Sequence, residues 1–134
     1  MPKTRIPNRN RSPFGWWIAS YLERLEWTGE HRANDKRRCL AWENTILVRA
    51  KDREQAYAKA LRFSRPTGST TVDDRGRRGK WKREGLTSLL PVYEEIKDGA
   101  ELLWREYAGI TVRKARSLVR TKRTLETFDD HEPA

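Results

Sequence analysis

Basic side chains gather in three stretches that contain no acidic residue, and these are the residues whose types and spacing indicate a chemical role most clearly. They occupy an N-terminal arm (1–13), a central segment (75–83) and a late segment (113–123). Because Arg and Lys neutralise phosphates and steer polyanions, the stretches indicate an acidic macromolecular partner, with nucleic acid as the first choice. The predicted partner-binding residues are Arg75, Arg77, Arg78, Lys80, Trp81, Lys82, Arg83, Arg113, Arg116, Arg120 and Arg123.

The central segment places an aromatic ring among cations. Strand alternation sends Trp81 and Arg83 to one face and the two lysines, Lys80 and Lys82, to the other. An exposed indole at this place would stack on a base, worth about 1–3 kcal/mol, while the cations meet phosphates. The alternative is that Trp81 belongs to the core and the cations form its rim.

The late segment has helical spacing. Arg113, Arg116, Arg120 and Arg123 share one face of a helix that Thr111 would cap. The alternative is an ordinary solvated helix face.

Residues for catalysis or metal binding do not converge in the sequence. An enzyme hypothesis has only Glu43, His31 and Glu101 as loose candidates, and His131 lies in the tail. Cys39 is the single cysteine, so it forms neither an internal disulfide nor a cysteine cluster. We therefore predict no catalytic residue, no metal and no cofactor. Glu43, beside apolar strand residues, requires either an Arg partner or an edge position.

The pattern of apolar and turn residues predicts the elements that position these side chains. Asp52 followed by Gln55 resembles a capping box. The predicted order is strand 16–27, strand 40–50, helix 52–64, a hairpin of 69–72 with 81–90 and a basic tip at 73–79, strand 100–107, and a last helix from 111. This order, β-β-α-β-β-β-α, predicts an α+β fold with a mainly antiparallel sheet of about five strands and one or two helices packed on one face.

Composition limits the size of the core. The chain has 134 residues, of which 36% are hydrophobic and 36% charged, with a net charge of +10. This length favours one α+β domain over 14–125, with a mobile basic arm at 1–13 and a loose acidic tail at 126–134. Six Trp enlarge a small core. No apolar stretch is long enough for a membrane span, so we expect a soluble cytoplasmic protein with no membrane partner.

Several segments together resemble a small bacterial family, the domain of unknown function DUF4288. The resemblance rests on 16–22, 42–50, 58–60, 81–86 and 92–107, and it covers about 15–108. Arg83 stands where that family tends to carry an aromatic residue. The arm and the late basic segment lie outside the resemblance, which supports the order of elements and transfers no catalytic residue.

Two functional hypotheses follow. The first is a non-catalytic protein that binds an acidic macromolecule through its basic segments. The second is a protein-binding module, such as an immunity protein that blocks a toxin, whose partner would offer an acidic surface. A homodimer formed across the sheet edges is also possible.

Overall fold

The computed structural model describes residues 5–30 and 33–131. His31 therefore lies outside the described residues. The chain forms two compact units, Met1–Leu103 and Trp104–Ala134, and the first holds the sheet.

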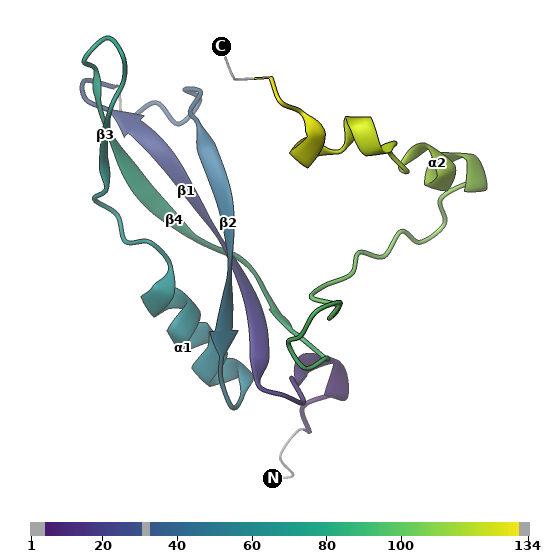
Figure 1. Cartoon of the computed structure of the whole chain (residues 1–134). Helices are drawn as coiled ribbons and strands as arrows, with labels where there is room; N and C mark the ends of the chain where they lie inside the picture. Colours follow the sequence, from purple (N-terminus) through teal and green to yellow (C-terminus); the bar gives the residue numbers. More distant parts are fainter. Residues whose placement is uncertain (1–4, 31–32, 132–134) are drawn as a thin grey trace. The chain divides into compact units, whose positions relative to one another are not determined.

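The sheet has four strands, β1 (Trp16–Trp27), β2 (Ala41–Arg49), β3 (Thr70–Val72) and β4 (Arg78–Pro91). Their order is β2-β1-β4-β3, and each neighbouring pair is antiparallel. Figure 1 shows the long, twisted central ribbon of β1 and β4 with β2 beside it. The predicted α+β class is confirmed, and so is the hairpin of β3 with β4.

One helix, α1 (Arg53–Phe63), packs on the sheet (Figure 1). Asp52 caps it as predicted, because its carboxylate accepts a 2.8 Å hydrogen bond from the Gln55 amide. Two fully buried alanines, Ala56 and Ala60, let the helix approach the sheet closely. They pack in a core whose buried sheet residues are Trp17, Ala19, Val48 and Ala50.

Alternation along β1 defines two faces of the sheet. We call the face that α1 covers, with Trp17, Ala19 and Leu25, the helix face, and the other the open face. The register between β1 and β4 shifts twice, near Ser20 and Leu22. These irregularities separate the apolar end of β4 from its basic end.

Residues 5–13, within the predicted arm, contain a short 3₁₀ turn, η1 (Asn8–Asn10). The Ser12 hydroxyl donates to the Val92 carbonyl at 2.8 Å, and the Tyr93 hydroxyl donates to the Arg9 carbonyl. This part of the arm therefore contacts the chain just after β4. None of the described helices has the length and apolar character needed to cross a membrane.

The chain from residue 100 onward contradicts two predictions. Residues 100–107 form no strand, so the sheet has four strands and not five. The last helix, α2, covers only Val112–Ser117, followed by the 3₁₀ turns η2 (Lys122–Thr124) and η3 (Glu126–Phe128). Thr111 does cap α2, since its side chain accepts from the Lys114 amide at 3.0 Å. Every described residue from 101 to 131 is exposed, so no buried apolar stripe extends the helix.

Candidate nucleic-acid interface

The basic end of β4 separates the predicted residues onto two faces, as alternation requires. Arg78, Lys80 and Lys82 are exposed on the open face, whereas Trp81 and Arg83 lie on the helix face. The cross-strand partners of these residues on β1 are consistent with this assignment of faces, because Lys80 lies opposite Glu26 and Trp81 lies opposite the buried Leu25.

Trp81 is part of the core. Only 8% of it is exposed, and its ring lies 4.3 Å from that of Trp42, centroid to centroid. The second of the two alternatives for Trp81 therefore describes this structure, and the indole has no free face for a base. Trp42, which is 47% exposed, is the accessible ring of the pair.

Arg83 forms hydrogen bonds within the fold. Its guanidinium donates to the Leu61 carbonyl at 2.8 Å and to the Ser64 hydroxyl at 2.7 Å. Its backbone amide donates to the Thr67 hydroxyl at 2.9 Å. These bonds satisfy acceptors at the C-terminal end of α1, where a cation also complements the helix dipole.

The three open-face cations border a groove of about 590 Å³. Successive cations on one face of a strand stand about 7 Å apart, which suits contact with a phosphate chain. Hydroxyls that can donate to phosphate oxygens stand beside them. The groove lining is Glu26, Trp27, Thr28, Thr67, Thr70, Thr71, Val72, Arg78, Gly79, Lys80 and Lys82.

One groove-lining residue, Trp27, has a cation over its ring. The Arg77 guanidinium lies 4.3 Å from the ring centroid of Trp27. Gly79 makes room for the indole, because a Cβ there would meet Trp27 Cε3 at 3.0 Å and Leu25 Cδ1 at 2.8 Å. The sequence reasoning missed Trp27 and the threonines. No local signal could have found them, because the registers that set Trp27 opposite Gly79 and Thr70 opposite Lys80 exist only in the folded sheet.

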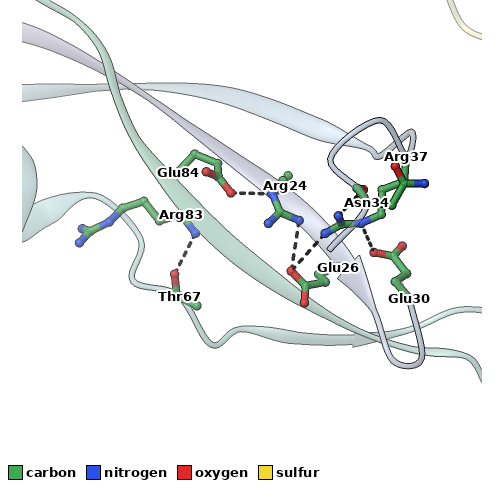
Figure 2. A network of polar contacts seen from close by, with 8 residues as sticks. All are labelled: Arg24, Glu26, Glu30, Asn34, Arg37, Thr67, Arg83 and Glu84. Atoms are coloured by element: carbon green, nitrogen blue, oxygen red, sulfur yellow. Dashed lines mark hydrogen bonds and ion pairs between the residues drawn. The ribbon is translucent and has the colours of Figure 1, made fainter. Parts of the chain in front are cut away.

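Acidic side chains near the groove form ion pairs with two arginines outside the hairpin, Arg24 and Arg37. Arg24 lies between Glu26 and Glu84 (Figure 2). Its Nη1 is 3.2 Å from Glu26 and its Nε is 2.5 Å from Glu84. Arg37 is 3.3 Å from Glu30 and 3.9 Å from Glu26. Burial opposes the charge on Arg24, but the hydrogen bonds and charges of Glu84 and Glu26 outweigh it and raise the pKa of Arg24.

The hairpin cations contrast with this network. Among the described residues, none of Arg75, Arg77, Arg78, Lys80 and Lys82 forms an ion pair. Asp73, in the turn, accepts bonds from the backbone amides of Arg75 and Arg77, at 3.0 and 2.7 Å, and not from their guanidinium groups. The hairpin therefore presents cations that form no ion pair with any residue in the described part of the chain.

The buried carboxylate is Glu23 and not Glu43. Glu23 is 1% exposed, accepts from the side-chain Nδ2 of Asn44 at 3.0 Å and lies 3.2 Å from the half-exposed Arg65. Glu43 is exposed on β2, which is an edge strand, so the edge alternative holds for it. The sequence offered no reason to distinguish Glu23 from the other acidic residues. Its burial follows from strand pairing, which sets it opposite both Trp42 and Arg83.

The late basic residues lie in the second unit and do not share one helix face. Arg113 and Arg116 are on α2, whereas Arg120 lies beyond it and Arg123 is in η2. Arg120 forms an ion pair with Glu126. The predicted stripe of four arginines is therefore wrong as a structural unit.

The other residues considered for chemistry remain separate. Cys39 is exposed and free, and the Glu101 amide donates to the Glu94 carboxylate at 2.7 Å. His131 is exposed, with Nδ1 3.0 Å from Asp129. In the described ranges, no three His, Cys, Asp or Glu side chains gather in a way that would hold a metal ion.

Comparison with known protein families identifies a family for this chain. The sequence profile described as "Domain of unknown function (DUF4288)" matches residues 16–104. No curated protein and no solved structure matches the chain. The matched range contains the whole sheet, α1 and the basic hairpin.

Proposed function

The chain belongs to the DUF4288 family, and we propose that it is a non-catalytic protein that binds the phosphate backbone of nucleic acid through its β3–β4 hairpin. The observation that supports this function is the row of Arg78, Lys80 and Lys82 beside the groove, which forms no ion pair in the described part of the chain. By contrast, Arg24, Arg37 and Arg65 of the first unit pair with Glu26, Glu30 and Glu23. The one carboxylate among the described residues that line the groove, Glu26, pairs with Arg24 and Arg37, and cations flanked by hydroxyls have the chemistry of a phosphate contact surface.

The groove favours backbone contact over base stacking. One face of the Trp27 ring has Arg77 on it, and Trp81 is buried. Among the described residues that line the groove, Trp27 is the only aromatic. Single-strand binders use open aromatic platforms, so this surface suits the continuous phosphate array of a duplex. We expect binding that depends little on sequence and strongly on salt.

The test is a salt series of affinity for a labelled random-sequence duplex and for the matching single strand, measured by fluorescence anisotropy. The variant Arg78→Ala/Lys80→Ala/Lys82→Ala removes the row. It should weaken duplex binding at every sequence and lower the logarithmic salt slope by about one for each cation removed. Wild type should bind the duplex at least as tightly as the single strand.

A matched control removes equal charge from another part of the first unit. Lys51, Arg53 and Lys97 are exposed cations without an ion pair in the described part of the chain. The variant Lys51→Ala/Arg53→Ala/Lys97→Ala should keep the wild-type salt slope. Equal losses in both variants would show a net-charge effect and overturn the hairpin as the site. No binding at low salt would overturn the nucleic-acid function and direct the search to an acidic protein, such as a toxin blocked by an immunity protein.

A further inference from the structure

The edge strand β2 has the features of a pairing surface. It is nine residues long and pairs with β1 without any register irregularity. It contains no Pro and no Lys, two devices that commonly protect a sheet edge. The opposite edge, β3, is only three residues long. β2 is therefore the longer of the two edges and offers more backbone groups for pairing.

Two hydrogen bonds establish which backbone groups of β2 point outward. The Ala50 amide donates to the Gly15 carbonyl, and the Leu25 amide donates to the Leu40 carbonyl, both at 2.8 Å. In an antiparallel pair, such bonded positions recur at every second residue. Even-numbered β2 residues therefore bond to β1, and the amides and carbonyls of the odd-numbered residues face the free edge. The Arg49 carbonyl is consistent with this phase, because it does not bond to β1 and instead accepts from Lys59 Nζ at 2.6 Å.

Charge along the edge is self-complementary in one register. Glu43 and Arg49 are both exposed, and both are odd-numbered residues on the open face. Antiparallel pairing of two β2 strands about a two-fold axis at Ile46 sets Glu43 opposite Arg49 of the partner subunit, twice. A two-fold axis at Thr45 would instead set Glu43 opposite the partner's Leu47, with no charge pair. The backbone phase permits the register centred on Ile46, because its bonded pairs join odd residues to odd residues.

Apolar contact coincides with this register. Leu47 is 45% exposed and lies opposite the buried Ile18, which in turn lies opposite the half-exposed Leu90. In the symmetric pair, Leu47 lies opposite Thr45 of the partner subunit and diagonal to the partner's Leu47. The apolar row would continue across the axis. Arg49 is held on the open face by Trp16, with its guanidinium 5.4 Å from the ring centroid.

We propose that β2 pairs with β2 of a second copy of this chain, in antiparallel register about Ile46, so that two sheets join into one. The axis is perpendicular to the sheet, so the open faces of both copies point the same way. Their rows of Arg78, Lys80 and Lys82 would then lie on one side of the dimer. The pairing rests on β2 and does not depend on the proposed nucleic-acid function.

The experiment is sedimentation velocity on the full chain, freed of nucleic acid, over a concentration series at moderate salt. Salt is needed because each copy carries a net charge of +10 and the copies repel one another. Wild type should dimerise. Glu43→Arg sets two cations opposite each other at both ends of the pair and should raise the dissociation constant by about tenfold or more. Glu43→Arg/Arg49→Glu exchanges the charges and should restore dimerisation.

A backbone variant tests the hydrogen-bond phase. Thr45→Pro removes an amide that faces outward, so the bonds to β1 stay and the monomer folds. The control Thr45→Val keeps the amide and loses the 2.9 Å contact between the Thr45 and Ser20 hydroxyls. Circular dichroism checks that each variant is folded. Any one of three results would overturn the proposal. The first is a monomeric wild type, and the second is a double variant Glu43→Arg/Arg49→Glu that dimerises as weakly as Glu43→Arg. The third is a folded Thr45→Pro that dimerises as strongly as Thr45→Val.

Discussion

Alternate residues of one strand, β4, have different roles. Gly79, Trp81 and Arg83 face the helix side, where they make room for Trp27, fill the core and bond to the end of α1. The open-face row of Arg78, Lys80 and Lys82 points to solvent with no acidic partner in the described chain.

The difference shows that position on the pleat, and not residue type, decides what a cation does. Arg83 and Lys82 are adjacent, yet the guanidinium of Arg83 has carbonyl and hydroxyl acceptors within the fold and Lys82 is exposed. Substitutions on the helix side should therefore lower the free energy of unfolding. Substitutions on the open face should change binding.

The largest effect is expected from Trp81→Ala. Removing a buried indole leaves a cavity against Leu25 and Trp42 and should cost about 3–5 kcal/mol of unfolding free energy, measured by urea denaturation. The control Trp42→Ala truncates the half-exposed ring of the same pair and should cost less than half as much. Equal losses would mean that Trp81 is no more buried than its partner.

Gly79→Ala should cost about 1–3 kcal/mol, because its Cβ overlaps Leu25 and Trp27 in a packed region. The displaced indole should also change the intrinsic fluorescence. A double variant with Trp27→Leu provides the control, since a smaller side chain removes part of the overlap. If Gly79→Ala costs as much with leucine at 27 as with tryptophan, the contact is not the cause.

Arg83→Ala should cost about 1.5 kcal/mol, the scale of a hydrogen bond to a charged group, and it should leave duplex affinity nearly unchanged. Arg83→Lys should recover only part of the loss, because an ammonium group does not reproduce the fixed geometry of the guanidinium. Denaturation and anisotropy on the same samples measure both quantities. A large loss of affinity in the folded variant would move Arg83 to the binding surface.

Lys82→Ala should have the smallest effect on stability, within about 0.5 kcal/mol, because the side chain is exposed and forms no ion pair among the described residues. It should nevertheless lower the salt slope of duplex binding by about one. Lys97→Ala, at an exposed site elsewhere, controls for charge. A Lys82→Ala variant with unchanged slope would remove the contrast between the two faces of β4.

Elements with strong local signals were predicted well. The alternation of 16–27 gave both ends of β1, and the Asp52 and Gln55 cap predicted α1 to within a residue of its start. Alternation along β4 also placed Trp81 and Arg83 on the face opposite the lysines. These features depend on side-chain period and on capping, which act over a few residues.

Predictions for the chain from residue 100 onward failed where local pattern was not enough. Residues 100–107 have strand composition, but the described chain gives them no neighbour to pair with. The helix after Thr111 ends at Ser117 because its apolar residues are exposed and its closely spaced cations repel one another. Local propensity therefore predicted elements there that no packing supports.

The sequence by itself determined the order of elements in the first unit, the position of the cap and the concentration of charge in acid-free stretches. Only the tertiary structure decided which cations are compensated, because partners such as Arg24 with Glu84 and Arg65 with Glu23 come from distant segments. It also decided that Glu23 is buried while Glu43 stands on the edge. Burial and pairing depend on strand order, and strand order is a property of the folded sheet and not of any local stretch of the chain.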